Sequence, residues 1–188
     1  MGAIVLLAVA NMSLASIGNP ASDRLLLSAG WTLRSSAELD EGGEAISRPG
    51  LDTSGWHRIR VPNTVVGALV ENGVYENPYF AMNLRDIPGT TYPIGENFVR
   101  HAMPEDSPFR QPWWYRTEFT LPARLDGRSV RLHFDGINYR ANVWVNGRRI
   151  ADSSQVAGTY RRYAFDVTAL LRANEANAIA VEVFAPEP

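Results

Sequence analysis

Two amides and two aromatic rings lie close together in the segment Asn77-Pro-Tyr-Phe-Ala-Met-Asn83. An asparagine amide both donates and accepts hydrogen bonds, so Asn77 and Asn83 suit a ligand that carries hydroxyl groups. The rings of Tyr79 and Phe80 can stack on an apolar face of such a ligand. These side chains are the best candidates in the chain for contact with a sugar. The alternative is that they only order a long loop.

Catalytic carboxylates are not evident. Asn174-Glu175 falls in a turn between a short helical turn and a strand, and Glu105-Asp106 lies in a proline-rich loop. Adjacent residues on an extended chain point in opposite directions, so Glu105 and Asp106 do not present two carboxyl groups to one substrate. We therefore expect no catalytic residue in this chain.

Other kinds of site are not expected either. His57, His101 and His133 show no ligand spacing and the chain has no cysteine, so we expect no metal site. No glycine-rich phosphate loop and no Gly-x-Ser-x-Gly motif occurs, and we expect no cofactor. The formal net charge of -2 gives no electrostatic basis for nucleic acid as a partner.

Short segments of alternating apolar and polar residues must position the candidate loop. Val130, Leu132 and Phe134 point to one face, and Asn146-Gly147 predicts a tight hairpin turn after a second alternating run. Alternation also occurs in residues 31–33, 56–61, 113–121, 158–166 and 178–184. Many short strands with one solvated face predict an all-β protein, an antiparallel jelly-roll β-sandwich.

One helix and one long loop interrupt these strands. Residues 64–73 predict a short helix, capped by Asn63 or Thr64 and ended by Gly73 in the left-handed conformation. Residues 74–112 contain many prolines, and loops of this length are usually functional or disordered. Their aromatic residues, which include Tyr92 and Phe98, indicate order.

Three outward-facing positions of the predicted sheets also lead to expectations. Trp113 and Trp114 are adjacent in a strand, so one belongs to the core and the other must be covered by a loop or a neighbouring domain. Trp144 also points outward. Arg116 and Glu118 share one face, and we expect them to pair on the surface.

Five segments in this order resemble the sugar-binding N-terminal domain of glycoside hydrolase family 2. They are Trp56 to Tyr75, Asn77 to Asn83, Trp113 to Phe119, Phe134-Asp-Gly-Ile-Asn-Tyr-Arg-Ala-Asn-Val-Trp-Val-Asn-Gly147, and Gly158 to Thr168. Within that family they are most similar to exo-β-glucosaminidases and endo-β-mannosidases. The resemblance covers most of residues 25–186.

The resemblance implies a larger, retaining enzyme that acts on β-linked glucosamine or mannose. Its catalytic carboxylates would lie in a (β/α)8 barrel that follows an immunoglobulin-like domain. This chain would then be a non-catalytic domain whose partners are a carbohydrate and those two domains. A free-standing carbohydrate-binding module and a protein-interaction domain remain alternatives, because fold alone does not choose among them.

Both ends of the chain carry expectations of their own. Residues 1–15 read as a signal peptide without a basic start, followed by a linker over 16–24 and the sandwich over 25–188. This predicts a secreted or periplasmic protein, and the apolar run at residues 2–10 is too short to span a membrane. An ordinary buried strand or helix is the alternative. The resemblance further implies one more loop and strand after Pro188.

Overall fold

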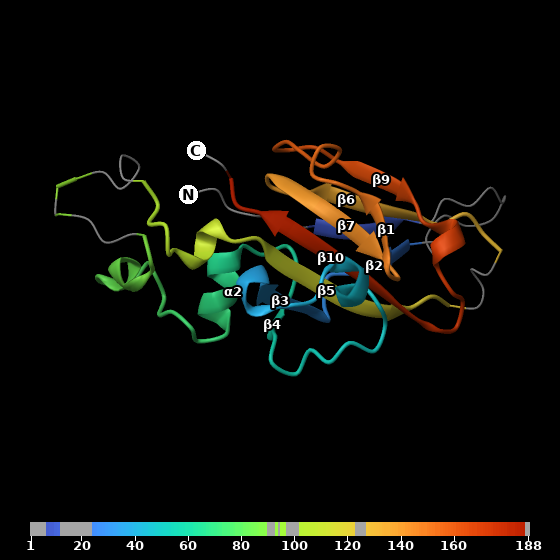
Figure 1. Ribbon diagram of the computed structural model, residues 1–188, viewed down its shortest axis with the longest axis horizontal. Coiled ribbons are helices and arrows are strands. Elements are labelled where there is room, and N and C mark those ends of the chain that lie inside the picture. Colours follow the sequence, from blue (N-terminus) through green and yellow to red (C-terminus); the bar gives the residue numbers. More distant parts are fainter. Residues whose placement is uncertain are drawn as a thin grey trace.

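The computed structural model describes residues 7–11, 24–89, 93, 95–96, 102–122 and 127–186. They form two antiparallel sheets (Figure 1). The four-stranded sheet has the order β2 (Arg24–Leu26), β1 (Leu7–Asn11), β6 (Arg131–Gly136), β9 (Tyr163–Asp166). The six-stranded sheet has the order β4 (His57–Ile59), β3 (Trp31–Ser35), β5 (Trp113–Thr120), β10 (Ala176–Phe184), β7 (Arg140–Val145), β8 (Arg148–Ala151). The predicted all-β sandwich is confirmed.

The core lies between the two sheets. Leu132 and Phe134 of β6 belong to the same buried cluster as Val143 of β7 and Ile179 of β10. Each is at most 2% exposed. These are alternate residues of their strands, as period-two burial requires. Removing this apolar surface from water is the main favourable term in folding.

The predicted Asn-Gly hairpin joins β7 to β8. Asn146 and Gly147 have φ angles of 48° and 84°, the positive values that a type I′ turn needs. The Asn146 amide also donates to the Leu170 carbonyl (2.7 Å) and to Oδ1 of Asn177 (2.8 Å). Its own oxygen accepts from the backbone N–H of Ala178 at 2.8 Å. The turn therefore fixes the start of β10 as well as the end of β7.

The predicted helix is α2 (Val65–Glu71). The hydroxyl of Thr64 accepts from the N–H of Gly67 at 2.9 Å, and Gly73 has a φ of 71°, so both predicted ends are confirmed. The short helix α1 (Gly43–Ile46) was not expected. It was missed because four residues are too few to show a helical period.

One strand prediction is corrected at its boundary. Of residues 158–166, only Tyr163–Asp166 forms a strand, which pairs with β6, and residues 159–160 are in a turn. Thr168, just after this strand, begins the 3-10 helix η6 (Thr168–Leu170). Its hydroxyl accepts from the N–H of Val130 at 2.8 Å and so links the end of β9 to the start of β6.

Strand β1 lies within the segment predicted as a signal peptide. It pairs with β2 on one side and with β6 on the other. This arrangement matches the alternative, an ordinary strand of the sheet. Cleavage after residue 15 stays a prediction.

The outer face of the six-stranded sheet is covered rather than solvated. Trp114 of β5 is 3% exposed and packs in a second cluster with Ile46 of α1 and Ala180 of β10. Trp144 of β7 packs against the same cluster. The covering segment is residues 36–56, which include α1 and the partly buried Leu39, Leu51 and Trp56 of this cluster. Trp114 is thus covered by a loop of this chain.

The predicted Arg116–Glu118 pair forms, but its arginine is buried. Arg116 is 3% exposed. Its guanidinium donates to the carbonyls of Ile46 (2.8 Å) and Arg48 (2.9 Å) and to the carboxylate of Glu118. The same carboxylate oxygen accepts from the N–H of Gly50 at 2.8 Å. Arg116 therefore holds the covering segment on the sheet.

We expect Arg116→Met to lower the free energy of unfolding by about 3 kcal/mol, because the buried guanidinium no longer donates to the Ile46 and Arg48 carbonyls or to the Glu118 carboxylate. Urea denaturation measures this change. Arg162→Met is the matched control, since the Arg162 side chain is 84% exposed and lies 3.6 Å from the Asp135 carboxylate. An equal effect of the two substitutions would contradict the role given to Arg116.

Gly43 allows α1 to approach Trp144 closely. A Cβ at residue 43 would lie 2.3 Å from Cε2 of Trp144. We expect Gly43→Ala to cost about 1–3 kcal/mol, because the indole ring must shift in a packed site. The thermal midpoint compared with that of Gly42→Ala tests this, since a Cβ at residue 42 meets nothing within 4 Å. Equal thermal midpoints of the two variants would contradict the prediction, because they would mean that the Trp144 ring can shift without cost.

Candidate functional site

The four predicted site residues are brought together in one compact turn after α2. The side chain of Asn77 accepts from the N–H of Tyr79 at 3.0 Å, and its carbonyl accepts from the N–H of Phe80 at 3.1 Å. The side-chain amide of Asn83 donates to the same carbonyl at 3.1 Å. Both asparagines thus shape the turn. This arrangement is consistent with a role in ordering the loop as well as with contact to a sugar.

The two aromatic rings of this turn face solvent. Tyr79 is 96% exposed and Phe80 is 70% exposed. Val74 and Met82, on either side of them in the sequence, are also exposed. Large apolar side chains that stay exposed on an ordered turn are typical of a binding surface. Figure 1 shows the segment after α2, in green, extending away from the sandwich.

Other aromatic residues of the long loop anchor it instead. Tyr75 contacts Phe109 with 6.3 Å between ring centroids, and both pack against the main core. The indole N–H of Trp113 donates to the Pro108 carbonyl at 3.0 Å. Partial burial raises the pKa of the Tyr75 hydroxyl, so this group stays neutral. Tyr92 and Phe98 lie outside the described residues.

The surroundings of the turn are acidic. Residues 71–89 and 102–112 contain five exposed carboxylates, those of Glu71, Glu76, Asp86, Glu105 and Asp106. The same ranges hold two arginines, Arg85 and Arg110. A Cβ at Gly89 would lie 3.3 Å from Pro104, so the parts that carry Asp86 and Glu105 are neighbours. Such a surface favours a positively charged ligand over a negatively charged one.

Both acidic pairs considered in the sequence lie in turns. Glu105 and Asp106 are exposed in one turn, and Asn174 lies in another with a φ of 58°. The described part of the chain also has no cluster of metal-ligating side chains and no helix able to cross a membrane.

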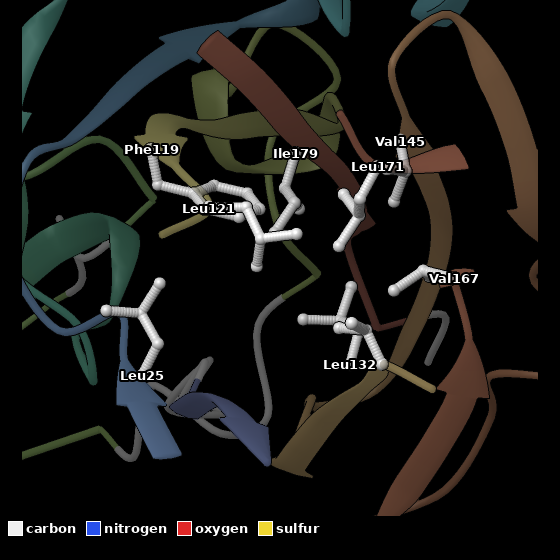
Figure 2. Close-up of a pocket in the computed structure, with 9 residues that line it drawn as sticks. Leu25, Phe119, Leu121, Leu132, Val145, Val167, Leu171 and Ile179 are labelled. Carbon is white, nitrogen blue, oxygen red and sulfur yellow. The ribbon is translucent and has the colours of Figure 1, made fainter. Parts of the chain in front are cut away.

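A small cavity lies between the sheets, and its lining offers no group that could bind a hydroxyl. It measures about 10 Å³ and is lined by apolar side chains that include Leu25, Phe119 and Ile179 (Figure 2). This is space for about one water molecule, but no polar partner lines it. A sugar ring does not fit there, so the exposed turn remains the candidate site.

Comparison with known proteins agrees with this architecture. The profile of the family described as glycosyl hydrolase 2 galactose-binding domain-like matches residues 31–187. The exo-β-D-glucosaminidase of Streptomyces avermitilis is 36% identical over 154 residues, which are 82% of this chain and 15% of that protein. The mannosylglycoprotein endo-β-mannosidase of Lilium longiflorum is 28% identical over 165 residues, 86% of this chain and 16% of that protein.

A solved structure matches as well. The crystal structure of the exo-chitosanase from Amycolatopsis orientalis superposes with a TM-score of 0.70 at 31% identity, over 85% of this chain and 16% of that one. The chain thus spans about one sixth of this structure's length and 15–16% of the two relatives above. With the sandwich, the covering segment and the family profile in agreement, the chain belongs to the glycosyl hydrolase 2 galactose-binding domain-like family.

Proposed function

We propose that this chain is a non-catalytic carbohydrate-binding and bracing domain of a secreted or periplasmic retaining glycoside hydrolase. The observation that carries the proposal is the ordered turn at residues 77–83, which presents two exposed aromatic rings beside two amides. Aromatic faces with a few placed polar groups are what sugar sites use. The relatives that it resembles include exo-β-D-glucosaminidases, a mannosylglycoprotein endo-β-mannosidase and β-galactosidases.

Charge favours glucosamine over mannose as the sugar. A glucosamine unit carries an ammonium group at neutral pH, and the turn is surrounded by exposed carboxylates such as Glu76 and Asp86. Opposite charges near a protein surface attract measurably at low ionic strength. The partners of the domain would be a β-linked oligosaccharide and the barrel and immunoglobulin-like domains of the same enzyme.

We expect the double substitution Tyr79→Ala/Phe80→Ala to weaken binding of glucosamine oligosaccharides by on the order of tenfold or more, because both stacking surfaces are lost. Calorimetric titration of the chain at low salt measures the affinity. Leu26→Ala is the control, since Leu26 is 60% exposed on strand β2 and carries no ring. Unchanged affinity in the double variant would remove the turn from sugar contact.

Hydrolysis by the chain alone is not expected, because the family resemblance places both catalytic carboxylates in a (β/α)8 barrel, whereas this chain forms a β-sandwich. Incubation with a chromogenic β-glucosaminide tests this directly. Steady release of the chromophore by pure protein would contradict a non-catalytic role. Binding of an oligosaccharide by the chain would instead exclude a protein-interaction domain without a sugar role.

A further inference from the structure

A second pair of exposed aromatic residues lies on two turns of the sandwich that are far apart in the sequence. Tyr160, in the turn before β9, is 97% exposed, and Tyr139, in the turn before β7, is 41% exposed. The N–H of Gly158 donates to the Tyr139 carbonyl at 3.0 Å. Arg140 and Ala157 also form an isolated β-bridge. The two turns therefore form one surface unit, which we call the Tyr160 surface.

Tyr160 is held in an unfavourable backbone conformation. Its φ is 59°, in the left-handed region that bulky side chains rarely adopt. Arg161 fixes the turn, because its guanidinium donates to the Ala157 carbonyl at 2.8 Å and lies 5.6 Å from the centroid of the Tyr163 ring. Backbone strain of this kind clusters at ligand-binding positions. Here its effect is to direct a large ring into solvent on an ordered turn.

The Tyr160 surface lies at the same end of the sandwich as the long loop. In the register of β10, Val183 pairs with Trp113 of β5 and Phe184 pairs with Arg140 of β7. The start of β7 is therefore two strands, or about 10 Å, from the start of β5, which the long loop enters. Figure 1 agrees, with the turn before β9 on the side from which the segment after α2 extends.

The charges of the two surfaces differ in sign. Arg161 and Arg162 follow Tyr160 in the sequence, and the Asp135 carboxylate lies 3.6 Å from the Arg162 guanidinium. The turn at residues 77–83 lies instead among carboxylates. A sugar with an ammonium group is thus repelled at the Tyr160 surface, whereas a neutral or carboxylated sugar is not.

We infer that the Tyr160 surface is a separate saccharide-binding site, which stacks a pyranose ring without positive charge on Tyr160. Thr159 and Arg162 are exposed and close to Tyr160 in the sequence, and their hydrogen-bonding groups suit the hydroxyls and a carboxylate of a sugar. The inference rests on the proposed function for the class of ligand. The Tyr160 surface differs from the turn at residues 77–83 in its residues and in the charge of the sugar that it would bind.

The test titrates the full chain at low salt with three oligosaccharides, which are β-linked mannose, β-linked glucuronate and β-linked glucosamine. Tyr160→Ala should weaken binding of the mannose or glucuronate oligosaccharide by on the order of tenfold and leave the affinity for the glucosamine oligosaccharide unchanged. Tyr79→Ala is the matched variant, because Tyr79 is 96% exposed. Tyr79→Ala should weaken binding of the glucosamine oligosaccharide and leave binding of the mannose and glucuronate oligosaccharides unchanged. Circular dichroism and the thermal midpoint establish that each variant is folded.

Several outcomes would overturn the inference, and they are distinguishable from failure of the proposed function. Loss of glucosamine binding in Tyr79→Ala, with no binding of mannose or glucuronate by the unmodified chain, keeps the proposed function and rejects the Tyr160 surface as a sugar site. Equal effects of both variants on one ligand reject a separate site. Weaker mannose binding in Tyr160→Ala, with no glucosamine binding at all, supports the inference and rejects the turn at residues 77–83.

Discussion

Strand β10 is buried on both faces, and the rest of the molecule is arranged around that constraint. Its inward residues Ile179, Val181 and Val183 are at most 1% exposed and fill the space between the sheets. Its outward residues Ala178 and Ala180 are fully buried as well. Because alanine is small, the rings of Trp114 and Trp144 can pack over the outer face of this strand. A covering layer is then required to keep those rings out of water.

The covering layer depends on a polar interaction in an apolar setting. Arg116, which is 3% exposed, donates to the backbone carbonyls of residues 46 and 48 and so ties the covering segment to β5. Its charge is balanced by Glu118, whose carboxylate also binds the N–H of Gly50. A buried arginine is tolerated when its hydrogen bonds and its charge are both satisfied. The outer face of the six-stranded sheet is thus covered by residues 36–56. The exposed aromatic residues lie instead on the loops at one end of the sandwich.

At that end the sandwich presents two ordered aromatic surfaces rather than one pocket. In the first, asparagine side chains bind the backbone of their own turn, so the rings of Tyr79 and Phe80 are held in place before any ligand arrives. In the second, Arg161 has the same effect for Tyr160. Such preorganisation lowers the entropy lost on binding. The different charges around the two surfaces are the basis of the different ligand preferences that we propose for them.

The sequence by itself determined most strands of the sandwich, the hairpin and the position of α2, because period-two alternation and turn residues act over a few neighbours. It also selected Asn77, Tyr79, Phe80 and Asn83, and the structure places them in one turn. Only the tertiary structure decided that Arg116 is buried and that α1 forms. Both depend on residues 36–56 lying against strands that are distant in the sequence. The pairing of the Tyr139 and Tyr160 turns was decided there too, because a contact between residues this far apart leaves no local pattern in the chain.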